Sequence, residues 1–163
     1  MINDYQQNLY DNLMNLVESS EAFYFQDVDL WDCTYRIFNY RLASYTEFLR
    51  PGALECRGVM FQIRKEGSPE EVTALRLASL PMEKFFNLNE NPMTMDLDLS
   101  TIDLIENKVD GSLISTFAHP DTVGVRLKSK GSLVSDQARA AMSWLAHPEN
   151  RRFEFELFRM STY

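Results

Sequence analysis

The sequence predicts an α+β domain in which antiparallel sheets are flanked by helices, and three observations support this fold class. Near the N-terminus, apolar residues recur at three- and four-residue spacing, which is the period of an amphipathic helix. Farther along, several short segments mix aromatic or β-branched residues with polar ones, as half-buried strands do. Short polar turns join some of these segments, so neighbouring strands are expected to pair antiparallel.

In the first half of the chain, the sequence predicts a long helix followed by four strands. The apolar spacing places the helix over residues 2–17, with its apolar face packed on the core. Four segments have the composition of half-buried strands: residues 23–25, 34–38, 59–63 and 72–78. The last two are expected to form a hairpin across the polar turn at residues 64–71. Between the two strand pairs, Ser44 and Glu47 have the spacing of a capping box for a short helix, which Pro51 and Gly52 end.

The second half is expected to contain a loop, four further strands and one helix. Residues 87–98 are rich in Asn, Met and Pro and predict the loop. The strand candidates are residues 102–106, 112–117, 123–128 and 153–158. Residues 119–121 form a turn between the second and third of these, and Ser135 is expected to cap a helix that runs to about Leu145 and is broken by residues 147–150. Because the chain stops at Tyr163, close to a strand that needs neighbours, we expect a domain incomplete at its C-terminus, either a cut piece or a naturally shortened protein. The open strand edge would permit self-association.

Composition favours one soluble domain over residues 1–163 and excludes several other classes. No apolar run approaches the length of a membrane span, and the N-terminus lacks the pattern of a signal peptide, so we expect a cytoplasmic protein. Cys33 and Cys56 have neither the density of a secreted scaffold nor metal-ligand spacing, which favours two buried thiols over a disulfide. His119 and His147 both precede proline in predicted turns and do not have the surroundings of catalytic residues. No zinc-type spacing of His, Cys or carboxylates is present.

The charge distribution argues against binding of nucleic acid by bulk attraction alone. The net charge is −8, whereas proteins that bind by bulk attraction are usually basic. The acidic excess lies in residues 1–103, which hold 8 basic and 17 acidic side chains, while residues 104–163 hold 8 and 7. A polyanion is therefore expected to meet local basic clusters, formed by Lys108, Arg126, Lys128 and Lys130.

The segment most informative about chemistry is Lys108-Val109-Asp110-Gly111-Ser112. A lysine attacks phosphorus only as the neutral amine, so a nucleophilic lysine needs nearby cations or desolvation to lower its pKa. Asp110 is positioned to orient the amine or an adjacent group, and Gly111 allows backbone to approach a nucleotide without a Cβ in the way. Taken alone, however, a Lys-x-Asp-Gly string is more often an ordinary turn.

Four other segments accompany this motif in a fixed order: Leu54-Glu55-Cys56-Arg57-Gly58, Pro81-Met82-Glu83-Lys84-Phe85-Phe86-Asn87, Leu127-Lys128-Ser129-Lys130-Gly131-Ser132 and Phe153-Glu154-Phe155. Together with the Lys108 motif they resemble the signatures of the bacteriophage ATP-dependent RNA ligases that repair broken tRNA, members of the covalent nucleotidyltransferase superfamily. The resemblance covers residues 54–155. It implies a ligase adenylation domain, with a family-specific N-terminal region at residues 1–100 and a nucleotidylation-motif core at residues 101–163.

The resemblance also implies a reaction, its cofactors and its partners. Lys108 would attack the α-phosphorus of ATP, in the presence of Mg²⁺, and hold AMP through a phosphoramidate bond. The adenylate would pass to the 5′-phosphate end of a broken tRNA, and a 3′-hydroxyl would then displace AMP and seal the strand. Such a protein would act in the cytoplasm of a phage-infected bacterial host. No residue is expected to be a dedicated metal ligand, since Mg²⁺ would be held largely by phosphate and water.

The same resemblance assigns ATP-binding roles to eight residues: Arg57, Lys84, Phe86, Asp110, Gly111, Lys128, Lys130 and Glu154. Cations near the phosphates carry much of the rate in such chemistry, which gives the role of Arg57, Lys128 and Lys130; without the resemblance, a solvated strand face is the simpler interpretation. Glu154 would accept hydrogen bonds from the ribose, with Glu156 as the competing register. Phe86 would stack on adenine, while Phe85 is expected to be buried in the core.

The chain departs from the family's pattern at its C-terminal end. An acidic-glycine motif, a lysine pair and a helical domain are expected after residue 163, so activity of these 163 residues alone is expected to be weak or absent. One alternative is therefore a nucleotide- or RNA-binding or protein-interaction module without catalysis. Another keeps the enzyme but assigns nicked DNA or a GTP-dependent capping reaction as its chemistry. The segments around Arg57 and Lys84 favour the RNA ligase branch.

Overall fold

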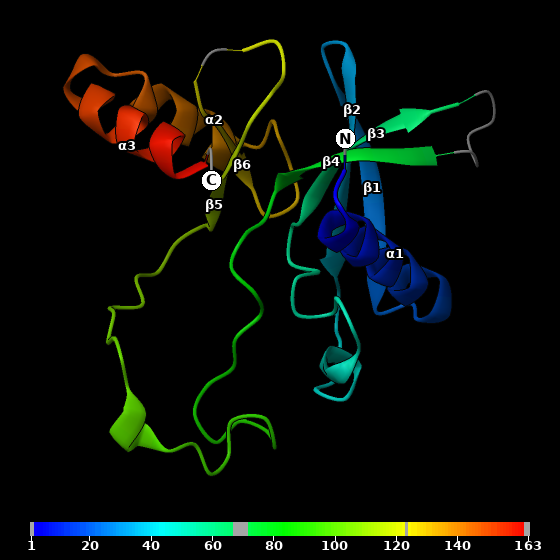
Figure 1. The fold of residues 1–163 in the computed structure, drawn as a ribbon. Helices are drawn as coiled ribbons and strands as arrows, with labels where there is room; N and C mark the ends of the chain where they lie inside the picture. Colours follow the sequence, from blue (N-terminus) through cyan, green and yellow to red (C-terminus); the bar gives the residue numbers. More distant parts are fainter. Residues whose placement is uncertain (1, 67–71, 123, 162–163) are drawn as a thin grey trace.

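The computed structural model describes residues 2–66, 72–122 and 124–161, and its elements are arranged in four layers (Figure 1). Helix α1 (Asp4–Ser19) packs on one face of a four-stranded sheet. A two-stranded sheet covers the other face, and helices α2 (Asp136–Leu145) and α3 (Arg151–Ser161) lie on the far side of that second sheet. The predicted α+β fold class with antiparallel sheets and flanking helices is confirmed.

The larger sheet contains β1 (Phe23–Leu30), β2 (Cys33–Tyr40), β3 (Met60–Lys65) and β4 (Val72–Ser79), paired antiparallel in that order. Because β2 lies inside the four-layer stack, residues on both of its faces are buried, with Tyr35 and Ile37 on one side and Phe38 on the other. The four predicted strands and the hairpin of β3 with β4 are confirmed. Part of the turn expected at residues 64–71 lies outside the described residues.

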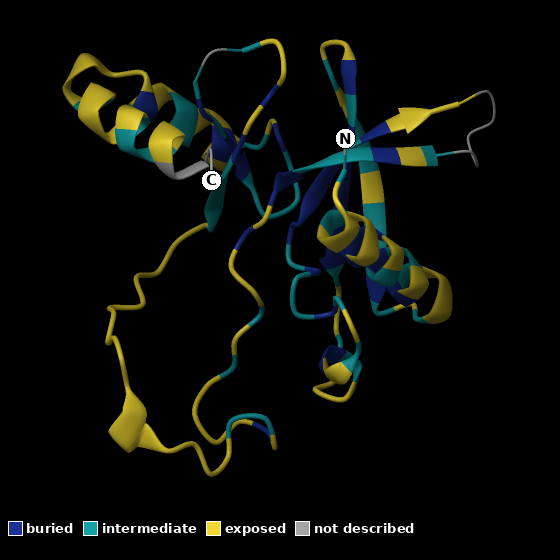
Figure 2. Cartoon of the chain, viewed as in Figure 1, coloured by how far each residue is buried: buried dark blue, intermediate teal, exposed yellow. Residues whose placement is uncertain are grey.

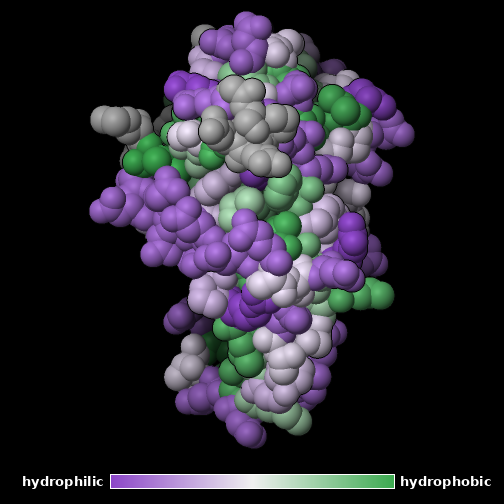
Figure 3. Space-filling view, turned by 90° about the vertical axis from the view of Figure 1, so that its right-hand side faces the viewer, coloured by the Kyte–Doolittle hydropathy of each residue, from purple (hydrophilic) through white to green (hydrophobic). Residues whose placement is uncertain are grey.

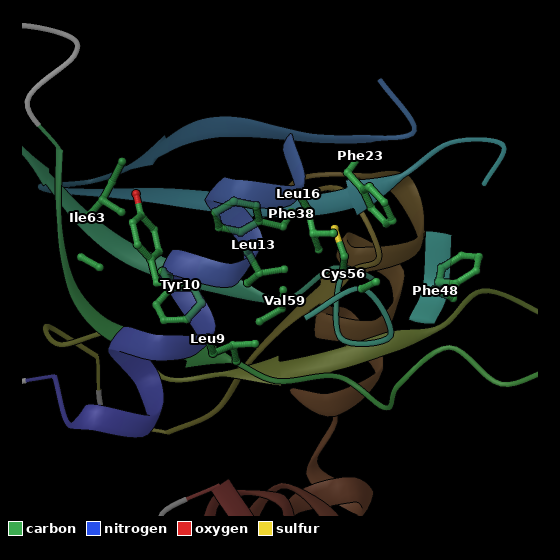
Figure 4. Close-up of a cluster of buried hydrophobic side chains, with 13 residues drawn as sticks. Leu9, Tyr10, Leu13, Leu16, Phe23, Phe38, Phe48, Cys56, Val59 and Ile63 are labelled. Atoms are coloured by element: carbon green, nitrogen blue, oxygen red, sulfur yellow. The ribbon is translucent and has the colours of Figure 1, made fainter. Parts of the chain in front are cut away.

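Helix α1 is held on this sheet by the apolar stripe that predicted it. Leu9, Tyr10, Leu13 and Leu16 are buried against the sheet, and Figure 4 shows their side chains directed into the same cluster as Phe38. The side chain of Asn3 accepts the Gln6 amide hydrogen at 2.9 Å and caps the helix. Burial of a leucine side chain of this kind contributes roughly 1.5–3 kcal/mol, so the helix is stabilised mainly by tertiary packing.

An ion pair lies in the layer between α1 and the sheet. The Arg36 guanidinium donates to both carboxylate oxygens of Asp27, at 2.8 and 3.0 Å, and to the Tyr10 hydroxyl at 2.9 Å. Burial raises the pKa of Asp27, but the hydrogen bonds and charge of Arg36, together with Lys65, outweigh burial and hold that pKa below its usual value. The charged forms are therefore the stable ones in this layer.

The smaller sheet pairs β5 (Ile114–Phe117) with β6 (Arg126–Ser129), as the sequence predicts. Phe117 and Leu133 pack on Tyr35, Ile37, Met60 and Ala78 of the larger sheet to form the core between the two sheets. A hydrogen bond from the Ser79 hydroxyl to the Thr116 carbonyl, 2.8 Å long, fixes the end of β4 beside β5.

The C-terminal residues form a helix where the sequence predicted a strand. Helix α2 begins at the predicted cap, because the Ser135 hydroxyl accepts the Ala138 amide hydrogen. A 3₁₀ turn at Pro148–Asn150 then leads directly into α3, so the prediction of a strand at residues 153–158 is wrong. Alternation over six residues also satisfies helical spacing: Phe153 packs on Trp144 with ring centroids 5.3 Å apart, and Leu157 packs on the α2 cluster.

Residues 81–113, here called the Lys108 segment, leave the layered core after β4 and return at β5 (Figure 1). Most of this segment is exposed in Figure 2, and its only described regular element is a 3₁₀ turn at Leu99–Thr101. The loop predicted at residues 87–98 is confirmed. The strand predicted at residues 102–106 is wrong, because those residues are exposed and pair with no described strand.

The capping box predicted at Ser44 and Glu47 does not form. A 3₁₀ helix at Glu47–Leu49 follows Ser44, but the Ser44 hydroxyl bonds to the Thr46 hydroxyl and does not cap this helix.

The face of the molecule in Figure 3 is mostly hydrophilic, with apolar residues in separate small patches. None of the described helices has both the length and the apolar character needed to cross a bilayer.

Candidate functional site

Lys108, Asp110 and Gly111 line an open cavity of about 670 Å³ together with Arg57. Arg57 belongs to the turn that precedes β3, whereas Lys108 lies in the exposed segment, so the cavity joins the layered core to the Lys108 segment. The Lys108 side chain is exposed and, within the described ranges, makes no hydrogen bond or ion pair. Its amine is therefore available to a ligand in the cavity.

Three cations gather beside this cavity without a described carboxylate partner. Arg57, Lys84 and Lys130 form no ion pair with any residue of the described ranges, and this group is called the cationic cluster below. Burial lowers the pKa of Lys130, and the charges of Arg57 and Lys84 lower it further, against an opposing effect of Cys56. Cations that repel one another in this way favour binding of an anion.

Backbone carbonyls and aromatic rings hold these cations in place. The Lys84 amine donates to the Phe85 carbonyl at 2.6 Å, and the Lys84 backbone amide donates to the Leu54 carbonyl at 2.8 Å. Arg57 lies over the Phe85 ring, 5.0 Å from its centroid, and Lys130 lies over the Tyr40 ring at 4.1 Å. The cluster is therefore organised by cation–π and carbonyl contacts, which leave its positive charge uncompensated.

The two phenylalanines of the Lys84 motif have surroundings opposite to those predicted. Phe85 is 49% exposed and lines the Lys108 cavity. Phe86 is half-buried and packs edge-on against Phe48, with ring centroids 5.5 Å apart. The prediction that Phe85 is the buried residue is therefore wrong. Phe86 instead lines a second cavity, of about 540 Å³, together with Lys84.

Lys128 lies apart from the first cavity, inside the molecule. Its side chain is fully buried, and its amine donates to the carbonyls of Gly58, at 2.8 Å, and Ser129, at 3.1 Å. Burial lowers the pKa of Lys128 to about 8. Gly58 has a φ of +94°, and a Cβ at this position would lie 2.5 Å from the Lys130 carbonyl oxygen. The turn before β3 and the end of β6 are thus in direct backbone contact.

Glu154 lies outside the Lys108 cavity. It lies on α3, half-buried, and lines a different cavity, of about 370 Å³, with Gly124, Arg151, Phe155 and Phe158. Neither Glu154 nor the alternative Glu156 lines the Lys108 cavity. The helical conformation of residues 151–161 explains this placement, because no strand carries these carboxylates alongside β6.

Some cavity residues were missed by sequence reasoning. Met82, Phe85 and Glu106 line the Lys108 cavity but received no role in it. For Met82 and Phe85 a signal existed, since both belong to the segment around Lys84. Nothing in the sequence around Glu106 distinguishes it from an ordinary solvated carboxylate.

The fold and the site together define a class of protein. An α+β domain that places an available lysine amine and Arg57 in one open cavity, with Lys84 and Lys130 near Arg57, has the groups needed to bind phosphates and to attack them. A family model described as RNA ligase matches residues 55–160, which is more than half of the chain and includes Arg57, Lys84, Lys108 and Lys130. The chain belongs to the RNA ligase family. The predicted resemblance is thereby confirmed, and family membership makes the protein a ligase with RNA as its class of substrate.

Proposed function

We propose that the protein is an ATP-dependent RNA ligase in which Lys108 becomes covalently adenylylated. The observation that carries this proposal is the shared cavity of Lys108 and Arg57, beside the cationic cluster. Membership of the RNA ligase family supports the same chemistry. Transfer of AMP requires a nucleophile and a phosphate-binding group on one site, and this cavity has both.

The cationic cluster would receive the triphosphate. Phosphoryl transfer depends largely on neutralising charge and positioning the phosphates in line, so uncompensated cations contribute directly to the rate. Arg57 presents a planar guanidinium that is suited to bidentate contact with phosphate oxygens, whereas Lys84 and Lys130 act as point charges. Lys128 donates to backbone carbonyls and would support the site by holding the Gly58 turn.

Lys108 would be the nucleophile. Its neutral amine attacks the α-phosphorus, a nitrogen–phosphorus bond forms, pyrophosphate leaves, and the ammonium proton passes to solvent. Because the amine is exposed without ligand, the bound nucleotide would exclude water from it, and the cationic cluster would hold the phosphates in line for its attack. Asp110, in the same cavity, is positioned to orient the amine.

Mg²⁺ fits the donor groups of this cavity. Glu106 and Asp110 line it, and carboxylate oxygens are ligands that Mg²⁺ prefers, with the remaining positions occupied by phosphate and water. Bound there, the ion would neutralise charge on the leaving pyrophosphate.

Phe85 and Phe86 offer two surfaces for the adenine base. Phe85 lines the Lys108 cavity, while Phe86 lines the neighbouring cavity and is partly occupied by its contact with Phe48. Aromatic stacking gives affinity without demanding a particular hydrogen-bond pattern. Comparing ATP binding by Phe85→Leu and Phe86→Leu would identify which ring carries the base.

The adenylate would then pass to the 5′-phosphate of an RNA end, and a 3′-hydroxyl would displace AMP to join the strands. Family membership supports RNA as the substrate, and the proposal extends it to the ends of a broken tRNA. The acidic surface outside the cavity would restrict binding to ends that reach the cationic cluster.

Incubation with α-labelled ATP and Mg²⁺ tests the proposal. Label should be acid-labile, as phosphoramidates are, and should map to Lys108 by mass spectrometry. Lys108→Ala should abolish the label, and because Lys108 is exposed the variant should melt like the parent. Lys65→Arg is the matched control, since Lys65 lies on β3 in an ion pair with Asp27, and it should label normally.

Label that survives Lys108→Ala would refute the assignment of the nucleophile. A preference for GTP over ATP would instead support a capping-type reaction. Absence of label, combined with protection of Lys108 by ATP against an amine-modifying reagent, would favour a nucleotide-binding module without catalysis.

A further inference from the structure

A cysteine, a histidine and an aspartate that are distant in sequence meet at the junction of the two sheets. Cys33 begins β2, and His119 and Asp121 belong to the turn between β5 and β6. One ligand atom from each residue, the Cys33 sulfur, a His119 ring nitrogen and an Asp121 carboxylate oxygen, lies within 4.8 Å of the other two. None of these residues lines the Lys108 cavity, so the cluster is separate from the proposed adenylylation site.

The imidazole of His119 is buried and held in one orientation. Its Nδ1 accepts the Asp121 amide hydrogen at 3.2 Å, which places the ring proton on Nε2, where it faces the Leu30 carbonyl at 3.4 Å. Histidines that ligate metals commonly donate their other ring N–H to a backbone carbonyl in this way, which fixes the tautomer. Nδ1, which lies 3.9 Å from a carboxylate oxygen of Asp121, would therefore be the ligand atom, and a bound ion would replace the Asp121 amide hydrogen at its lone pair.

Hydrogen-bond donors lie beside the Cys33 sulfur. The Gln62 side-chain amide donates to the Cys33 sulfur at 3.2 Å. The Tyr35 hydroxyl is buried and has no hydrogen-bond partner among the described residues, although the Cys33 thiol and Arg76 both act on it electrostatically. It is thus a donor that a thiolate can use.

We propose that Cys33, His119 and Asp121 bind a Zn²⁺ ion, with water in the fourth position. Thiolate, imidazole and carboxylate are the three ligand types that zinc takes, and one thiolate plus one carboxylate balances its charge. From zinc bond lengths, donor atoms of a tetrahedral site lie roughly 3.3–3.7 Å apart. The side chain of Asp121 is 65% exposed and free to rotate inward by the small distance required, and binding releases the Cys33 proton to solvent.

The ion would fasten the β5–β6 turn to the β1–β2 hairpin. Trp31, at the tip of that hairpin, adopts a φ of 50°, which is unusual for a bulky residue, and places its ring 4.6 Å from the His119 ring. The Arg126 guanidinium of β6 lies over the same indole, 4.7 Å from its ring centroid. The indole therefore covers the imidazole, while exposed Asp121 leaves the aspartate side of the site accessible to an entering ion.

Titration of the metal-free full chain with Co²⁺, which replaces Zn²⁺ in such sites, tests the proposal without any activity measurement. Tetrahedral coordination with one thiolate should produce a near-ultraviolet charge-transfer band and visible d–d bands, and stoichiometric Zn²⁺ should bleach both. Zn²⁺ should also raise the thermal midpoint in proportion to its affinity. Absence of a thiolate band from the parent protein would overturn the site.

Matched variants localise the site. Asp121→Asn changes an exposed side chain. Loss of a residue that only hydrogen-bonds a metal ligand weakens metal binding roughly 10- to 100-fold, and Asp121→Asn should weaken Co²⁺ binding by more than that, because Asp121 is itself a proposed ligand. Cys33→Ser should remove the thiolate band. Cys56→Ala is the control cysteine, and Glu149→Gln is the control carboxylate, since Glu149 contacts His147 at the same two-residue spacing but on the surface. Unchanged binding in Asp121→Asn, or loss of the band in either control, would contradict the proposed ligands.

Discussion

Lys128 and Lys108 belong to two regions of the molecule with opposite properties. Lys128 lies in the layered core, fully buried, with its amine held by backbone carbonyls. Lys108 lies in an exposed segment and has no polar partner among the described residues. Burial in the layered core favours the neutral amine of Lys128. Lys128, however, is not the lysine that forms the bond to AMP in the proposed reaction.

This difference teaches where activation of the nucleophile must come from. A nucleophile with a permanently lowered pKa would need to be buried, and a buried lysine could not receive a triphosphate. An exposed amine in an open cavity beside unpaired cations can be activated by the nucleotide itself. The core would then act as the rigid support that holds Arg57 and Lys130, and the Lys108 segment would complete the site when ligand binds.

The largest expected difference between the two regions is in packing. Leu13→Ala empties a fully buried position on α1 and should cost about 2–5 kcal/mol of unfolding free energy. Leu104→Ala removes a side chain that is 71% exposed in the Lys108 segment and should cost less than about 0.5 kcal/mol. Urea unfolding of both variants measures this. Similar losses would show that the segment packs on the core in solution.

A smaller difference is expected between two glycines with positive φ. In Gly58→Ala the new Cβ meets the Lys130 carbonyl, so the strain and the displaced backbone should cost about 2–3 kcal/mol. Gly111 has a φ of +148°, but a Cβ there meets nothing within 4 Å, so Gly111→Ala should cost the backbone strain alone, about 1 kcal/mol. Thermal and urea unfolding measure both. Equal costs would argue against the close contact between Gly58 and β6.

The smallest expected difference is a dependence on pH. The folded pKa of Lys128, about 8, lies below the ordinary lysine pKa of 10.5, so the unfolded chain binds more protons between these values and stability from this group rises with pH. Below about pH 8 the charged amine is buried at full cost. The parent should therefore gain about 1–2 kcal/mol relative to Lys128→Met between pH 8 and 9.5.

Urea unfolding at several pH values measures the gain. Leu104→Ala, which removes no titratable group, is the control, and the difference between it and the parent should stay constant over the same range. A constant difference between the parent and Lys128→Met as well would show that burial does not shift Lys128.

The elements that could be predicted from sequence are those whose own residues decide their structure. The stripe of Leu9, Leu13 and Leu16 requires a helix with one buried face, and Ser135 supplies a cap with local geometry. Whether a segment forms a strand depends also on a neighbouring strand with which its backbone can pair. Residues 102–106 have suitable composition but no neighbouring strand among the described residues, and residues 153–158 contact α2 as a helix.

For the candidate site, the residues that belong to motifs could be predicted from the sequence, but their surroundings could not. Lys108 and Arg57 could be named because each belongs to a motif, and the structure places them in one cavity. The sequence could not indicate that Phe85 rather than Phe86 faces that cavity, because adjacent residues in a loop follow no period. Nor could it bring Cys33 to His119, since their meeting depends on the packing of one sheet on the other.

The hydrogen bond between Ser79 and Thr116 has a consequence for the evolution and engineering of this protein. It joins the two ends of the Lys108 segment, so the chain departs from and re-enters the core at almost the same point. The entropy of closing such a loop grows only with the logarithm of its length, by about 0.6 kcal/mol per doubling. Residues 95–101, all of them exposed, are therefore a tolerant position for an inserted peptide or a fluorescent reporter.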